Sequence, residues 1–212
     1  LSLLKRYFIV GGMPSAVREF REGNDYKLAH MEQQSILSTY QDDFAKYRAK
    51  LHIRRLQMVF GRIPSLVGEK LKYVNIDRNE RAKDLADCID MLQLARVVYC
   101  VKHASGNEIP LEAETDRKSF KPLFLDVGLM SAALGLNPVE INLANDLLPL
   151  FNGAIAEQFA GQQLLYRGDP YSTPELHYWQ REKRGAAAEV DYLIARGPRI
   201  IPVEIKAGKT GS

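Results

Sequence analysis

The chain has 212 residues, which is enough for one large domain or two smaller ones that each bury a hydrophobic core. Its 29 lysines and arginines barely exceed its 26 aspartates and glutamates, and the net charge of +3 does not by itself indicate a nucleic-acid partner. The cysteines, Cys88 and Cys100, form no C-x-x-C pair, which argues against a disulfide scaffold or a structural zinc site and favours a reducing, cytoplasmic location. No apolar run reaches the roughly 20 residues that span a bilayer, so we expect a soluble protein without membrane contact.

Residues 1–50 are predicted to form a helical N-terminal segment. Gly11 and Gly12 interrupt it, and a long stretch further on has apolar side chains at helical spacing: Leu28, Met31, Ile36, Tyr40, Phe44 and Tyr47. The sequence starts at Leu1 without a signal-peptide pattern and stops at Ser212 directly after a strand-like run. We therefore interpret it as a fragment of a longer chain.

Residues 51–125 predict the element order helix, helix, longer helix, strand, polar loop, strand. Asp77 and Glu80 resemble a capping box, and the helix after them has one apolar face formed by Ala82, Leu85, Ile89 and Leu92. The strands are predicted over 96–102 and 120–126. Helices followed by a two-stranded wing are typical of a winged helix-turn-helix, so we expect a separate winged-helix-like domain.

Residues 126–212 predict an α/β (α+β) module. A helix is expected over 153–165, and strands are expected over 175–182, 187–195 and 199–207.

The last two of these strands are predicted to form a hairpin. A two-residue turn at Gly197 and Pro198 would set Asp191 directly opposite Glu204. The period of two then predicts a charged face with Glu189, Asp191, Glu204 and Lys206, and an apolar face with Val190, Tyr192, Ile194, Ile201, Val203 and Ile205.

Opposed carboxylates, about 5 Å apart across a sheet, repel each other unless a cation neutralises them. Mg²⁺ or Mn²⁺ suits such oxygen ligands, and a bound ion would meet the needs of phosphodiester hydrolysis by acidifying a water and polarising a phosphoryl oxygen. Lys206 could orient the water or offset developing charge. Glu157 could reach the same metal, because its helix face carries small residues: Gly153, Ala154, Ala160 and Gly161. The alternative is an amphipathic hairpin in which Lys206 merely pairs with Glu189.

The segments GAIAEQFAGQQLL, EVDYLIA and PVEIKAG resemble the Glu, Asp, Glu-x-Lys signature of the PD-(D/E)xK (restriction-endonuclease-like) nuclease superfamily. This resemblance implies metal binding by Asp191 and Glu204, a role for Lys206 toward the water or the transition state, and a supporting metal contact by Glu157. The superfamily core continues with a further helix and strand after Glu-x-Lys, so 126–212 would be a truncated nuclease-like domain.

The wider layout, with YFIVGGMPSAV near the start and FLDVGLMSAALG before the signature, is similar to an uncharacterised bacterial and archaeal family in which this region follows an AAA+-type ATPase domain. The resemblance implies such a domain in the full-length protein. Gly208, Lys209 and Thr210 match only the tail of a P-loop, since that motif requires glycine at the position of Val203. We expect no ATPase activity from this chain alone.

Two basic segments are candidates for DNA contact. KYRAKLHIRR suits a phosphate backbone, and YWQREKR combines aromatic with basic side chains that could stack a base and hold phosphate. The expected contact residues are Arg54, Arg55, Arg181, Lys183 and Arg184. The alternatives are a solvated helix face for the first segment and a core position for Trp179 in the second.

Two functions remain in competition. The first is a DNA-directed module of an ATPase-linked protein, with a nuclease-like site that uses Mg²⁺ or Mn²⁺. The second is a non-catalytic interaction or regulatory module of the parent ATPase. Retention of all four site residues favours the first function, and the small net charge favours the second.

Overall fold

The computed structural model describes residues 2–46, 50–143, 153–167, 171, 174–181 and 188–206. Its helices are α1 (Ser2–Val10), α2 (Pro14–Gly23), α3 (Tyr26–Asp43), α4 (Lys50–Arg62), α5 (Tyr73–Ile76), α6 (Ala82–Leu94), α7 (Val127–Ala133), α8 (Pro138–Leu143) and α9 (Gly153–Leu165). Short 3₁₀ helices are η1 (Phe44–Lys46), η2 (Ile63–Leu66) and η3 (Leu111–Glu114), and the strands are β1 (Val98–Ala104), β2 (Thr115–Phe124), β3 (His177–Arg181), β4 (Ala188–Arg196) and β5 (Arg199–Val203).

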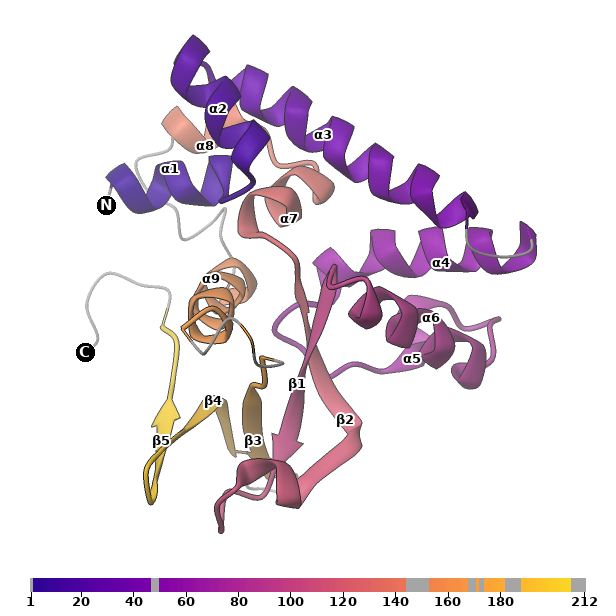
Figure 1. Ribbon diagram of the computed structural model, residues 1–212, viewed down its shortest axis with the longest axis vertical. Coiled ribbons are helices and arrows are strands. Elements are labelled where there is room, and N and C mark those ends of the chain that lie inside the picture. The colour runs from indigo at the N-terminus through magenta and orange to yellow at the C-terminus, as the bar shows by residue number, and fades with distance from the viewer. Residues whose placement is uncertain are drawn as a thin grey trace.

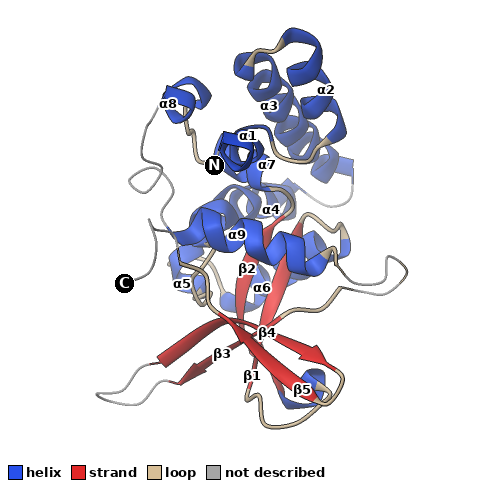
Figure 2. Ribbon diagram, turned by 90° about the vertical axis from the view of Figure 1, so that its left-hand side faces the viewer, coloured by secondary structure: helices blue, strands red, loops and turns tan. Residues whose placement is uncertain are grey.

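The molecule has a helical end and a sheet end. Figures 1 and 2 show α1, α2, α3, α7 and α8 gathered at one end, the twisted sheet at the other, and α9 between them. The predicted α+β class is therefore confirmed. None of the helices in the described ranges combines the length and the apolar character needed to cross a membrane.

The strands form one mixed sheet with the order β2-β1-β3-β4-β5. Strands β1 and β3 are parallel, with Lys102 opposite His177, and the other neighbours are antiparallel. The Lys102 N–H donates to the Leu176 carbonyl at 3.0 Å, which fixes this junction. The sheet is thus continuous from β2 to the strand that carries Asp191.

The prediction of a separate winged-helix domain over 51–125 is wrong. Helices α4, α5 and α6 and strands β1 and β2 do follow in the predicted order, and Leu85, Ile89 and Leu92 are buried. However, β1 pairs with β3, so the expected wing is part of the larger sheet. The α6 helix also begins at Ala82, because Asp77 ends α5 instead of starting a helix.

The helical N-terminal segment is confirmed for the described residues, and it packs on the later part of the chain. Gln33 from α3 donates to the carbonyls of Ile9 and Val10 at 2.8 and 2.9 Å. Ser131 from α7 donates to the Phe8 carbonyl at 3.0 Å. These bonds fasten α1 between α3 and α7.

Asp126 joins three distant segments at one buried carboxylate. It caps α7 by accepting the N–H groups of Gly128 and Leu129 at 2.9 and 3.0 Å. It also accepts the Gly12 N–H at 2.8 Å and the Gln162 side-chain amide at 3.3 Å. Gly11 has a φ of +72°, and a Cβ there would lie 2.0 Å from the carboxylate, so glycine at position 11 is required for this approach.

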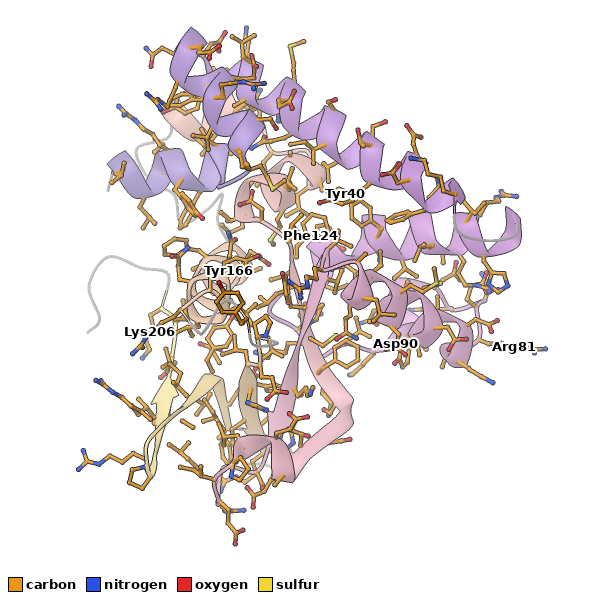
Figure 3. All side chains as sticks on the ribbon, in the orientation of Figure 1. Tyr40, Arg81, Asp90, Phe124, Tyr166 and Lys206 are labelled. Atoms are coloured by element: carbon orange, nitrogen blue, oxygen red, sulfur yellow. The ribbon has the colours of Figure 1, made fainter. Side chains whose placement is uncertain are left out.

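Helix α9 is held against the start of α7 and the end of β2. Gln158 accepts the Phe124 N–H at 2.8 Å and donates to the Phe124 carbonyl at 2.7 Å, and Gln162 accepts the Val127 N–H at 3.0 Å. Phe124 is almost fully buried in the main core, and Figure 3 shows it where the helical end meets the sheet. The two buried glutamines therefore fix the position from which α9 presents Glu157 to the sheet.

We expect Gly161→Ala to destabilise the fold by roughly 1–3 kcal/mol, because it overpacks the contact between α9 and the sheet. A Cβ at Gly161 would lie 2.6 Å from both Leu123 Cδ1 and Tyr192 Oη. Gly61→Ala in α4 is the matched control, since nothing lies within 4 Å of its Cβ. That variant should gain about 0.5–1 kcal/mol from helix propensity. Urea unfolding measures both changes, and equal changes would contradict the close packing of α9.

Candidate acidic site around Lys121

Lys121 in β2 is a buried lysine surrounded by carboxylates. Its side chain is 4% exposed, and its Nζ lies 3.5 Å from Glu157 Oε2, 3.8 Å from Asp191 Oδ1 and in closest contact with Glu189 Oε1. Glu157 comes from α9, and the other two acids come from β4. We call these four residues the acidic site.

A bulge in β4 aims Asp191 into the acidic site. In the β3–β4 pairing, His177 lies opposite Leu193 and Trp179 lies opposite Val190. Two residues of β4, Asp191 and Tyr192, therefore lie opposite a single residue of β3, Tyr178. An extra residue of this kind changes which face of the sheet each side chain takes. Tyr192 therefore points toward α9, and its hydroxyl donates to the Glu157 carbonyl at 2.7 Å.

The predicted faces of β4 are corrected by this bulge. Val190 packs with Leu193 in a small core on the far side of the sheet, whereas Tyr192 lies in the main core under α9. A period of two along the whole strand predicts that Val190 and Tyr192 share a face. The bulge breaks that period next to Asp191.

Neighbouring groups limit the freedom of the buried charges. Gly68 has a φ of +85°, and a Cβ there would lie 3.3 Å from both carboxylate oxygens of Glu157, so this loop passes directly over that side chain. Lys121 Nζ lies 5.5 Å from the centre of the Tyr178 ring, a favourable cation–π geometry. Tyr178 is itself held by a 2.9 Å hydrogen bond between its hydroxyl and that of Ser119.

The acidic site has more negative than positive charge. Burial raises the pKa of Glu157 to about 7, Asp191 and Glu189 add to the rise, and Lys121 opposes it. Burial alone would lower the pKa of Lys121, but contacts with Glu189, Glu157 and Asp191 outweigh burial and raise that pKa. Three carboxylates thus compete for one ammonium group, and Glu157 responds by holding its proton more strongly.

Glu204 and Lys206 lie outside this cluster. The predicted hairpin register is confirmed by the pairs Ile194–Ile201 and Tyr192–Val203, but β5 ends at Val203. The side chains of Glu204 and Lys206 are 64% and 74% exposed, 3.9 Å apart, and Figure 3 shows Lys206 at the outer edge of the molecule.

Asp191 bonds to the backbone beyond β5 instead of facing Glu204. Its Oδ2 accepts the Ile205 N–H at 2.7 Å. Val203 and Ile205 pack toward the main core, so the alternation of side chains turns Glu204 away from it. Of the four signature residues, the structure brings Glu157 and Asp191 together and leaves Glu204 and Lys206 apart from them.

The predicted DNA-contact residues have different surroundings. Arg55 is not available for phosphate, because its guanidinium is 10% exposed and binds Glu80 at 2.7 Å and Asp84 at 3.3 Å, which ties α4 to α6. Arg54 and Arg181 are exposed. Lys183 and Arg184 lie outside the described residues. Trp179 packs against the small core, as the alternative interpretation held.

We expect Glu157→Gln to remove a pH dependence of stability. A carboxyl whose folded pKa is raised stabilises the fold at low pH, and that stability is lost as pH rises from about 4.5 to about 7. The loss amounts to at most about 3 kcal/mol for the wild type relative to Glu157→Gln. Urea unfolding across this pH range measures the difference. Glu22→Gln, at an exposed glutamate of α2, should run parallel to the wild type. A parallel Glu157→Gln curve would contradict the burial of this acid.

Comparison with protein families divides the chain at α8. Residues 1–140 match a family model described as a domain of unknown function (DUF8612), and residues 152–212 match a second domain of unknown function (DUF4143), which often follows AAA ATPases. No curated protein and no solved structure matches the chain. The acidic site takes Lys121 from the first matched region and its three carboxylates from the second. Since the first model covers more than half of the sequence, the chain belongs to the DUF8612 family.

Proposed function

We propose that the acidic site binds a divalent cation, Mg²⁺ or Mn²⁺, and that the module cleaves phosphodiester bonds in DNA as part of an ATPase-linked protein. One observation carries this proposal. Glu157 and Asp191, from two separate segments of the nuclease-like signature, lie 3.5 and 3.8 Å from the same ammonium group, beside the third carboxylate of Glu189.

The residues present suit such an ion. The donor set consists of carboxylate oxygens, which Mg²⁺ and Mn²⁺ prefer, and the surplus of negative charge favours a cation. Glu157 and Asp191 would hold it. When bound, the ion supplies charge stabilisation and an acidified water for hydrolysis. Lys121 takes the role that the signature gives to Lys206, because its charged ammonium group is positioned to offset negative charge on a phosphate.

The link to an ATPase is supported by the second family match. Residues 152–212 match a domain that often follows AAA ATPases. The sequence has no complete P-loop motif, so ATP binding would belong to another domain of the full-length protein.

A metal-dependent cleavage assay on the full-length protein tests this function. Double-stranded and single-stranded DNA are incubated with the protein and Mn²⁺ or Mg²⁺, with and without a chelator. We expect metal-dependent cleavage that Asp191→Asn and Glu157→Gln abolish, while Glu204→Gln retains most of it because that side chain lies outside the acidic site. Cleavage that is equal in the wild type and Asp191→Asn would overturn the proposal.

A second function is favoured by a different observation. Lys121 already occupies the centre of the acidic site, and the exposed Glu204 and Lys206 do not complete it. A non-catalytic module that regulates its ATPase would need nothing more. For such a module we expect no DNA cleavage in any metal, together with an ATPase rate of the full-length protein that changes when the acidic site is altered by the isosteric substitution Asp191→Asn.

A further inference from the structure

A second group of metal-ligating side chains lies away from the acidic site. Glu112 from η3, Glu175 just before β3 and His177 in β3 each offer a ligand atom, and these atoms lie within 4.8 Å of one another. They line a cavity of about 420 Å³. We call these three residues the histidine cluster.

The fold fixes this cluster from two sides. His177 is buried, and its Nε2 lies 3.2 Å from Glu112 Oε2. The Lys102 ammonium donates to the other oxygen of Glu112, Oε1, at 2.6 Å, and therefore orients that carboxylate while leaving Oε2 directed at His177. Lys102 also lies opposite His177 across the parallel β1–β3 pair, which places both groups on adjacent, hydrogen-bonded strands of the sheet. Ordered outer partners of this kind are typical of metal ligands.

We propose that the histidine cluster binds one Zn²⁺ ion through His177, Glu112 and Glu175, with a fourth position open to the cavity. One imidazole and two carboxylates form a mixed nitrogen and oxygen donor set, which suits Zn²⁺ and other transition ions, whereas Mg²⁺ prefers oxygen alone. Two ligands of a tetrahedral Zn²⁺ ion lie roughly 3.4 Å apart, given bond lengths of about 2.1 Å. The 3.2 Å between His177 and Glu112 is already close to this separation. Glu175 is exposed and free to close the remaining distance by a change of rotamer.

The competing explanation is a purely structural chain in which Lys102, Glu112 and His177 are hydrogen-bonded and no ion binds. The two explanations differ in the role of Glu175, because that side chain belongs to the donor set and not to the chain of hydrogen bonds. The Zn²⁺ proposal can be tested independently of the proposed function, since the histidine cluster shares no residue with the acidic site.

Zn²⁺ titration calorimetry tests the proposal, with excess Mg²⁺ present to occupy the acidic site. We expect one Zn²⁺ per chain, and visible absorption when Co²⁺ replaces it. Loss of a side chain that only orients a metal ligand weakens metal binding by roughly 10-fold or more. His177→Gln and Glu175→Gln each remove a ligand itself, so each should weaken Zn²⁺ binding by more than roughly 10-fold. Glu175→Gln keeps the test valid if His177→Gln does not fold, since Glu175 is exposed.

Two control variants sharpen the experiment. Glu108→Gln changes a nearby exposed glutamate outside the histidine cluster, and Asp191→Asn changes the acidic site. Both should bind Zn²⁺ like the wild type. Unchanged Zn²⁺ affinity in both His177→Gln and Glu175→Gln, or no Zn²⁺ binding by the wild type at micromolar concentration, would overturn the proposal.

Discussion

Lys121→Met is expected to destabilise the fold by roughly 3–5 kcal/mol at pH 8, because removing one partner of a buried ion pair leaves charge without compensation. The side chain is 4% exposed, and methionine has a similar volume, so the loss reports charge and not a cavity. The loss should shrink as pH falls below about 7, since burial raises the pKa of Glu157 to about 7 and its protonation removes one of the uncompensated charges. Urea unfolding at a series of pH values measures both effects.

Lys102→Met is the matched control for this substitution. Lys102 lies on the neighbouring strand, its side chain is 30% exposed, and it pairs with the single carboxylate of Glu112. We expect it to cost about 1 kcal/mol or less, as for a partly exposed pair. Equal losses for Lys121→Met and Lys102→Met would mean that the carboxylates around Lys121 are solvated and do not form a buried charged cluster.

Asp126→Ala is expected to cost roughly 4 kcal/mol. The substitution removes the acceptor for the N–H groups of Gly12, Gly128 and Leu129, and each buried donor left without a partner costs about 1–3 kcal/mol. Because Asp126 joins α1, α7 and α9, the loss should appear in the global unfolding transition. Chemical denaturation followed by far-ultraviolet circular dichroism gives the free energy.

Asp25→Ala provides the comparison for Asp126→Ala. Asp25 also caps a helix, α3, but it is exposed and accepts the Lys27 N–H, at 2.8 Å. Loss of such a cap costs about 1 kcal/mol. If Asp126→Ala cost no more than Asp25→Ala, Asp126 would act as an ordinary cap and would not join the three segments.

The β4–β5 hairpin could be predicted from the sequence because its turn depends on local chemistry. The face of the sheet that each of its side chains takes could not be predicted in this way. The turn at Gly197 and Pro198 is fixed by local conformational preference, so the pairing of Ile194 with Ile201 followed from the sequence. The bulge at Asp191 and Tyr192 depends on how β3 pairs with β4. Nothing in an alternating pattern marks the place where one strand gains a residue relative to its partner.

The pairing that makes the sheet continuous could not be predicted from the sequence, for a related reason. A strand pattern gives the periodicity of β1 but not its partner, and the parallel β1–β3 pair joins segments separated by more than 70 residues. A hairpin that pairs only with itself and a hairpin that continues into a larger sheet have the same local sequence pattern. The winged-helix prediction therefore failed at the level of strand pairing and not of secondary structure.

Lys121 was missed although the sequence contains a signal for it. In the segment FKPLFLD, Lys121 and Leu123 are two residues apart, so their side chains lie on the same face of the strand. A strand that is otherwise apolar buries such a face, and the pattern therefore indicates a buried lysine. A buried lysine requires acidic partners, and the acids of β4 supply them. Arg55 illustrates the opposite error, because a basic run suggested DNA contact where the arginine in fact pairs with Glu80 and Asp84.

The most direct test of the acidic site is a Mn²⁺ titration, in which electron paramagnetic resonance measures the free ion. For the wild type we expect one bound Mn²⁺ per chain that is lost in both Asp191→Asn and Glu157→Gln. Glu204→Gln should retain the ion, because that carboxylate lies outside the acidic site. Mn²⁺ binding that is identical in the wild type, Asp191→Asn and Glu157→Gln would contradict the assignment of the acidic site as a divalent-cation site.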